Sequence, residues 1–241
     1  MAPAQSTQTP WSRPTDSLNT AFLAGLRPAL AGVAVPEKSE GMAAYMKSSM
    51  PFLGVPSPTV RKTVRALAKT HPFTDVEQLH GTVSALWHNA SFREERYAAI
   101  MLTDSRLGRG EVGLLPFYAV VIETGQWWDF VDTVAPRLWE LLQNHRTTMD
   151  PLLREWSMHP NFWFRRAAVI SQLPAKVETD TQLLNDVITV NMADREFFIR
   201  KAIGWALRQY ARTDPDWVRN YVAAHEGQLS PLSSREALKR L

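Results

Sequence analysis

The segment FFIRKAIGWALRQYARTDP, residues 197–215, decides the fold class of this chain. Lys201, Trp205 and Arg208 stand at i, i+4 and i+7, the spacing that places side chains on one face of an α-helix. Asp214 and Pro215 then supply a capping carboxylate and a proline suited to the first position of another helix. The segment therefore predicts two consecutive helices joined by a short link.

Helix signals of this kind recur along the chain, whereas strand signals are scarce. Asp150-Pro151 repeats the carboxylate and proline signal, and the capping box is matched by Thr74 with Glu77 and by Ser91 with Glu94. Only LLPFYAVVIET, residues 114–124, is as dense in Val and aromatic residues as a buried strand, and without a partner run a helix is favoured. Helices are expected near residues 18–31, 37–49, 58–70, 75–88, 91–107, 112–124, 127–145, 151–158, 161–172, 180–192, 196–211, 215–225 and 232–240.

Short links between these helices predict an all-α fold, either a bundle or a stack of helical pairs. Two-helix units of roughly 35 to 45 residues would match HEAT-like or armadillo-type repeats, which form a right-handed α-solenoid with a concave surface. No strong residue-level self-similarity supports that repeat from pattern alone. Residues 1–16, rich in Pro, Ser, Thr and Gln, are predicted to be a disordered N-terminal arm, and residues 17–241 a single domain.

The composition of the chain excludes several classes of function. With 45% hydrophobic and 21% charged residues the chain is typical of a globular protein, and its net charge of +3 permits a nucleic-acid partner without requiring one. Because there is no cysteine, disulfides, thiolate zinc sites and thiol nucleophiles are excluded. Glycine-rich phosphate motifs and the H-E-x-x-H metal motif are also missing. We therefore expect no cofactor and no metal. No uncharged run approaches the ~20 residues of a membrane span, so none is expected. A cytoplasmic protein, associated with the nucleoid if bacterial, fits the lack of cysteine without following from it.

Two helical stripes combine aromatic and charged side chains. Trp128 and Asp132 are four residues apart and share a face. The second stripe consists of Lys201, Trp205, Arg208 and Arg212. Together they suggest a nucleic-acid surface that contains reactive groups. Structural alternatives remain open: a tryptophan is often a core anchor, a charged stripe is often a solvated helix face, and Arg166, three residues after Trp163, could form a salt bridge between helices.

Five segments resemble the AlkD-like DNA glycosylases of the DNA alkylation repair family. They are YMKSSMPFLGV (45–55), WWDFVD (127–132), WFRRAAVISQL (163–173), FFIRKAIGWALRQYARTDP (197–215) and LSSREALK (232–239). The resemblance covers about residues 37 to 240. It implies a solenoid of HEAT-like repeats whose concave surface binds DNA, and a glycosylase that removes positively charged N3- and N7-alkylated purines from duplex DNA.

The resemblance also implies roles for individual residues. Trp128, Asp132 and Trp205 would form the catalytic cluster, Arg166 would contact the DNA backbone, and Tyr45 would lie close to the lesion. One position departs from the family pattern, because Pro56 stands where we associate a polar Gln with these glycosylases.

The chemistry of the reaction suits these residues. An alkylated purine carries positive charge, so it leaves as a neutral base and needs no general acid. Asp132 could stabilise the oxocarbenium-like sugar, while Trp128 and Trp205 present negative ring faces to the cation. The basic residues Arg166, Lys201, Arg208 and Arg212 would hold phosphates.

These observations predict a monomeric, monofunctional glycosylase acting on double-stranded DNA. A lyase would need an amine nucleophile for a Schiff base, and Lys201 is assigned to phosphate instead. The alternative from a different class is a non-catalytic helical-repeat module that binds branched or damaged DNA or a protein partner.

Overall fold

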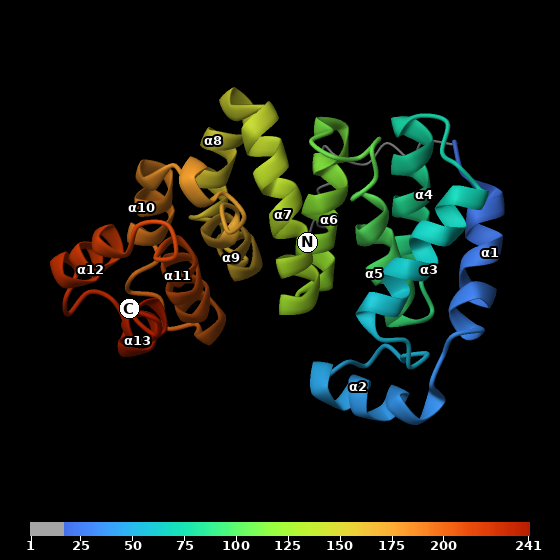
Figure 1. The fold of residues 1–241 in the computed structure, drawn as a ribbon, viewed down its shortest axis with the longest axis horizontal. Coiled ribbons are helices and arrows are strands. Elements are labelled where there is room, and N and C mark those ends of the chain that lie inside the picture. The colour runs from blue at the N-terminus through green and yellow to red at the C-terminus, as the bar shows by residue number, and fades with distance from the viewer. Residues whose placement is uncertain (1–16) are drawn as a thin grey trace, which may run out of the picture. The chain divides into compact units, whose positions relative to one another are not determined.

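The computed structural model describes residues 17–241, and this part of the chain contains thirteen α-helices, three short 3-10 helices and no strand (Figure 1). The all-α prediction is therefore confirmed, including a helix at residues 115–125 where a strand was the competing interpretation. The predicted N-terminal arm, residues 1–16, lies outside the described residues. The α-helices are α1 (Thr20–Ala31), α2 (Ser39–Met46), α3 (Ser57–Thr70), α4 (Val76–Asn89), α5 (Arg93–Leu102), α6 (Leu115–Gly125), α7 (Trp128–Asn144), α8 (Arg146–Trp156), α9 (Phe162–Ile170), α10 (Thr181–Thr189), α11 (Phe197–Tyr210), α12 (Pro215–Ala224) and α13 (Pro231–Ala237).

The chain divides into two compact units, Met1–Tyr118 and Ala119–Leu241, and the boundary falls within α6. In the described part of the first unit, α1, α3 and α5 pack together, and α4 packs against α1 and α5. In the second unit α7, α9 and α11 pack in succession, and α8 and α10 form a second layer against them. This stacking of helices in two layers is that of a helical-repeat fold. The single domain expected over residues 17–241 stays a prediction.

A 35-residue interval, not recognised in the sequence, underlies the stacking. Phe92, Trp127, Phe162 and Phe197 are spaced 35 residues apart. Phe92 and Trp127 are the N-cap residues of α5 and α7, and Phe162 and Phe197 are the first residues of α9 and α11. Each of these helices thus begins with an aromatic residue at the same place in its repeat. In the last three repeats the next residue is aromatic as well, giving Trp127-Trp128, Phe162-Trp163 and Phe197-Phe198. One or two aromatic positions in 35 residues are too little similarity to stand out in a single sequence.

The helix start predicted at Asp150-Pro151 is wrong. Helix α8 begins at Arg146, and Asp150 lies inside it and pairs with Arg154 at 2.7 Å, one turn further on. Pro151 therefore lies within the helix, where its missing N–H removes one backbone hydrogen bond. The earlier start adds a turn that fully buries Met149. By contrast, Asp214 caps α12 as predicted.

The two predicted capping boxes are each shifted by one residue. At α4 the N-cap is Asp75, which accepts a hydrogen bond from the backbone of Gln78 at 2.8 Å. At α5 the carboxylate that reaches back to the backbone N–H groups of Ser91 and Phe92 belongs to Glu95. Glu94 is fully buried instead, and it accepts hydrogen bonds at 2.9–3.0 Å from the backbone N–H groups of residues 53–55. Glu94 thus fixes the loop that precedes α3.

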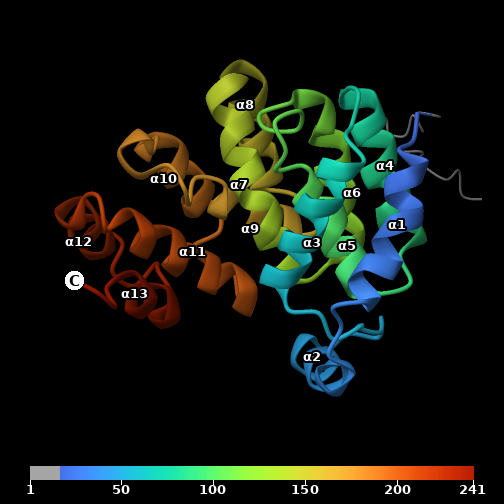
Figure 2. The same ribbon diagram turned by 45° about the vertical axis from the view of Figure 1, so that its right-hand side comes forward.

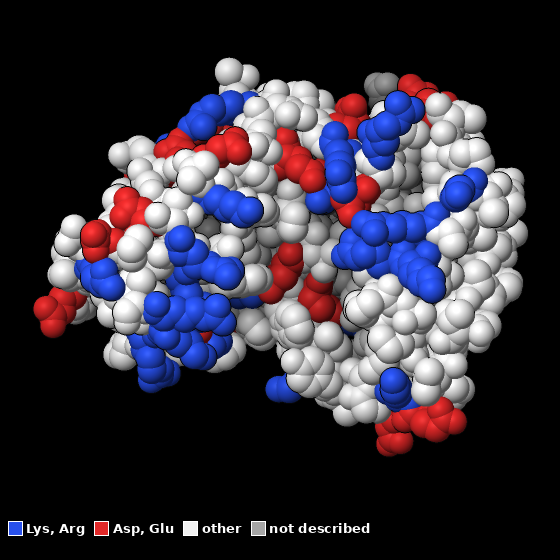
Figure 3. Space-filling view, viewed as in Figure 1, with Lys and Arg blue, Asp and Glu red and all other residues white. Residues whose placement is uncertain are grey.

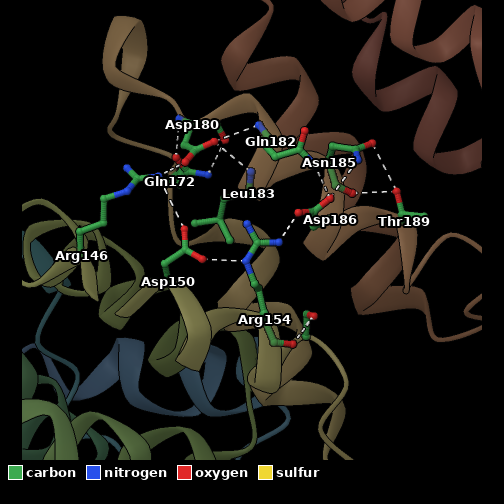
Figure 4. Close-up of polar contacts among 11 residues, drawn as sticks. Arg146, Asp150, Arg154, Gln172, Asp180, Gln182, Leu183, Asn185, Asp186 and Thr189 are labelled. Carbon is green, nitrogen blue, oxygen red and sulfur yellow. Dashed lines mark hydrogen bonds and ion pairs between the residues drawn. The ribbon is translucent and has the colours of Figure 1, made fainter. Parts of the chain in front are cut away.

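Charged side chains join α8 to α10 in the outer layer of the second unit (Figure 4). Arg154 lies between Asp150 of its own helix and Asp186 of α10, and Arg146 pairs with Asp180, the N-cap residue of α10. Partly exposed pairs of this kind contribute on the order of 0.2–1 kcal/mol each. The pairs of Arg146 with Asp180 and of Arg154 with Asp186 join α8 to α10 directly. Among the described helices, none combines the length and apolar character needed to cross a membrane.

Candidate active site

Arg166, on α9, connects the two helices that carry the predicted catalytic residues, α7 with Trp128 and Asp132 and α11 with Trp205. From α9 its Nε and one terminal nitrogen donate to the two carboxylate oxygens of Asp132 on α7, at 2.8 and 2.7 Å. Its other terminal nitrogen donates to the backbone carbonyl of Phe198 on α11 at 2.6 Å. The guanidinium also lies 5.9 Å from the centre of the Phe198 ring. Arg166 thereby sets the positions of α7, α9 and α11 relative to one another.

This contact is the interhelical salt bridge that the sequence left open as the alternative for Arg166. Arg166 is 5% exposed, so its guanidinium is a buried group whose charge is balanced by a bidentate carboxylate. The structure thus assigns it a structural contact in the protein. The contact between Arg166 and the DNA backbone stays a prediction. To make it, Arg166 would have to use the N–H groups of its terminal nitrogens that do not bind Asp132 or Phe198.

Asp132 lies in an environment that opposes its negative charge. Its side chain is 16% exposed, and burial raises the pKa of Asp132 above the usual value. The hydrogen bonds and positive charge of Arg166 lower the pKa, and the neighbouring Asp129 raises it further. Burial is the largest of these effects. A carboxylate held at such a place exerts a stronger field than one in water, because less solvent screens it.

The tryptophans separate into core residues and partly exposed ones. Among the tryptophans that share no helical stripe with charged residues, Trp87, Trp139 and Trp156 are at most 9% exposed and are core anchors, whereas Trp217 is partly exposed and stacks on Tyr221. Trp128, the first residue of α7, and Trp205, on α11, are both partly exposed. Neither is therefore a fully buried core anchor. Their catalytic role stays a prediction.

An aromatic cluster at the starts of α7, α9 and α11 was missed in the sequence. Trp127 packs against Trp163 and Phe198, with ring centres 6.2 and 5.5 Å apart, and Trp163 and Phe198 are 5.0 Å from one another. Trp127 thus packs between the starts of the three helices, while Trp128 lies on the same face of α7 as Asp132. The only sequence signal for this cluster is the pair of aromatic residues repeated every 35 residues, Trp127-Trp128, Phe162-Trp163 and Phe197-Phe198, which is weak in a single sequence.

Positive charge gathers over α11 and α13 in the second unit (Figure 3). Lys201 and Arg208, both partly exposed, form ion pairs with Glu236 of α13. These pairs hold the pKa of the Glu236 carboxyl below its usual value. Arg212 is exposed and has no ion pair within residues 17–241. Of the three cations in the predicted basic stripe, Lys201 and Arg208 are therefore paired with a carboxylate, and Arg212 is exposed without an ion pair in the described residues.

Two further residues from the sequence analysis lie in the first unit. Tyr45 is 73% exposed on α2, and its proximity to a lesion stays a prediction. Pro56 is the N-cap residue of α3 and makes no side-chain capping bond, and the effect of its replacing a polar Gln of the family pattern stays untested. Within the described range, no group of three His, Asp or Glu side chains is placed to hold a metal ion.

The chain is similar to known proteins in sequence and in fold. The sequence model of a family described as DNA alkylation repair enzyme matches residues 26–241. A solved structure described as a predicted DNA alkylation repair enzyme from Enterococcus faecalis is 35% identical and superposes with a TM-score of 0.76, covering 86% of this chain and 96% of that one. No curated protein matches. The match over most of the chain, in sequence and in fold, indicates a role in DNA repair, and the chain belongs to the DNA alkylation repair enzyme family.

Proposed function

We propose that this protein is a monofunctional DNA glycosylase that hydrolyses the N-glycosidic bond of cationic N3- or N7-alkylated purines in duplex DNA, without a metal ion. The observation that carries the proposal is the buried pair of Asp132 and Arg166. The pair joins α7, which also bears Trp128, to α9, and Arg166 contacts α11, the helix of the basic stripe, through the carbonyl of Phe198. The chain belongs to the DNA alkylation repair enzyme family.

The reaction needs a negative charge that is in place before the bond breaks. As the neutral base leaves, positive charge develops on the deoxyribose, and a nearby carboxylate stabilises it. Arg166 holds both oxygens of Asp132, so the carboxylate is oriented in advance. Each oxygen keeps another lone pair for a water molecule or for the sugar. In this account Asp132 is the catalytic residue and Arg166 is a positioning residue.

Trp128 and Trp205 would distinguish a cationic purine from a normal one. A cation over an aromatic ring gains on the order of 0.5–2 kcal/mol, and a neutral base does not gain this term. Both rings are partly exposed, as contact with DNA requires. The selectivity of the enzyme for charged lesions would come from these rings, and its affinity for duplex from the basic residues.

The absence of lyase activity is supported by the surroundings of Lys201. A lyase forms a Schiff base through a free amine. The Lys201 ammonium lies 3.0 Å from Glu236 and is engaged in an ion pair. We therefore assign Lys201 to charge interactions, and the product would be an abasic site with an intact strand.

A non-catalytic module that binds DNA or a protein partner is the alternative function. The buried Asp132–Arg166 pair also fits this alternative, because such a pair could serve only to join α7 to α9. Incubation with duplex DNA treated with a methylating agent separates the two functions. The glycosylase is supported if 7-methylguanine or 3-methyladenine is released faster with the protein than without it, and if this release also occurs in the presence of a chelator. Binding of this DNA without release of either base contradicts it.

A further inference from the structure

Glu236 is placed between two cations of the predicted DNA-binding stripe. Its carboxylate lies 3.0 Å from the Lys201 ammonium and also accepts a hydrogen bond from the Arg208 guanidinium. Lys201 and Arg208 are seven residues apart on α11, and Trp205 lies between them in the sequence. One carboxylate thus engages both cations that flank the predicted catalytic tryptophan.

The position of Glu236 is set by close packing of α13 on α11, which both ribbon views show (Figures 1 and 2). Ser233, one turn before Glu236, is 1% exposed, and its hydroxyl donates to the backbone carbonyl of Arg200 at 3.0 Å. Ala237 is fully buried. These contacts anchor α13 without using the carboxylate, so the charge of Glu236 is not needed to attach the helix.

The two cations remain accessible although they are paired. The side chains of Lys201 and Arg208 are 37% and 24% exposed, compared with 6% for Arg166 in its pair with Asp132. A phosphate group could therefore reach Lys201 and Arg208, but it would have to compete with a carboxylate already in contact with both. Carboxylate and phosphate oxygens are alternative partners for the same donors.

We infer that Glu236 is an internal counterion that occupies Lys201 and Arg208 in the free protein and so restrains its affinity for undamaged duplex DNA. This inference rests on the proposed function, because it takes the face around Trp205 to be the one that binds DNA. Phosphate contacts add affinity without reading the base. A carboxylate that competes for them lowers binding to ordinary duplex and leaves the contribution of Trp205 to lesion recognition in place.

The test measures binding of unmodified duplex across a range of salt concentrations. Glu236→Gln removes the charge and keeps the shape of the side chain. Each additional phosphate that the protein neutralises steepens the slope of log K against log salt by about 0.9, which is about tenfold in affinity near ~0.1 M salt. The variant should therefore bind unmodified duplex about tenfold more tightly and with a slope steeper by about one. Adding Arg208→Gln to it should return the slope towards that of the wild type.

Asp216→Asn is the matched control. Asp216 is 82% exposed on α12 and pairs with Arg219 at 2.8 Å, so this change also adds one positive charge and frees one arginine. Its salt slope should equal that of the wild type. Thermal unfolding checks the fold of each variant. Glu236→Asp, which keeps the charge but shortens its reach, should give a slope between those of the wild type and Glu236→Gln, and it tests the inference if the glutamine variant does not fold.

Three results would overturn the inference. A Glu236→Gln protein with the wild-type slope, or with weaker affinity, would show that Glu236 does not compete with phosphate. An equal gain for Asp216→Asn would assign the effect to net charge alone. In these first two cases the inference about Glu236 would fail, but the proposed glycosylase activity would stand. If the wild type and Glu236→Gln both fail to bind duplex at any salt concentration, the proposed function fails together with the inference.

Discussion

Gly204 of α11 lies directly beneath Glu236 of α13, so close that a Cβ atom on Gly204 would stand 2.5 Å from the Cβ of Glu236. The same atom would lie 2.9 Å from the backbone carbonyl oxygen of Ser233. Backbone atoms such as this carbonyl oxygen cannot move aside as the end of a flexible side chain can. The absence of a side chain at this position is therefore what allows the two helices to pack together.

Gly204→Ala is expected to destabilise the protein, because the added methyl group must push α13 away from α11. Overpacking of this kind typically costs about 1–3 kcal/mol, which exceeds the gain of about 1 kcal/mol from alanine in a helix. Gly41→Ala is the control, since Gly41 lies in α2 with no atom within 4 Å of its added Cβ. Thermal unfolding should show a loss for the first variant and none for the second. Equal stabilities would mean that the helices do not pack this closely.

Trp205→Ala and Trp128→Ala are expected to weaken binding to duplex containing a cationic alkylpurine more than binding to unmodified duplex. The lost ring face interacts with the charge of the lesion, on the order of 0.5–2 kcal/mol for each ring. Trp87→Ala is the contrasting change, because Trp87 is 1% exposed and its removal should cost about 3–5 kcal/mol of stability. Fluorescence anisotropy with paired duplexes measures the first effect, and thermal unfolding the second. Equal losses on both duplexes would remove the two tryptophans from lesion recognition.

Arg212→Ala is expected to flatten the salt dependence of duplex binding by about 0.9, the contribution of one phosphate contact. Arg212 suits this test because it is exposed and has no ion pair in the described part of the chain, so its removal leaves no carboxylate unpaired. Arg219→Ala on α12 is the control and should leave the slope unchanged. The change should be similar for modified and unmodified DNA. A wild-type slope for Arg212→Ala would place the DNA-binding surface elsewhere.

Excision is expected to fall as the pH decreases through the pKa of Asp132, because the account requires the ionised carboxylate. Burial raises this pKa above the usual 3.8, while Arg166 lowers it. Arg166→Gln removes the opposing charge, so the acidic limb of the single-turnover pH profile should move to higher pH. Profiles corrected for spontaneous depurination measure this shift. An unchanged acidic limb would show that Arg166 does not act through Asp132.

The same pKa shift has a defined effect on stability. Because the pKa of Asp132 is higher in the folded protein than in the unfolded chain, folding favours its protonated form. The contribution of this group to stability is therefore largest below the unfolded pKa and is lost as the pH rises through the folded pKa.

Local sequence signals predicted the helices well, but they did not predict which charged residues far apart in the sequence pair with one another. Asp214 caps its helix as expected, because a cap and its partner lie within one turn. Glu236 was not recognised, since its partners Lys201 and Arg208 lie 35 and 28 residues away and nothing in one sequence pairs them. For the same reason Arg166 could be assigned either to a salt bridge or to DNA. Only packing of α9 against α7 shows that it holds Asp132.

The central claim is tested most directly by the single-turnover rate at which Asp132→Asn releases 7-methylguanine from methylated duplex. Asparagine nearly preserves the shape and removes the carboxylate charge beside Arg166, so folding of the variant is verified by thermal unfolding at the assay temperature. The account predicts a loss of at least ~3 kcal/mol in transition-state stabilisation, about two orders of magnitude in rate, while duplex binding is retained. A folded Asp132→Asn protein whose rate stays within about threefold of the wild type would contradict it, because threefold corresponds to less than about 1 kcal/mol.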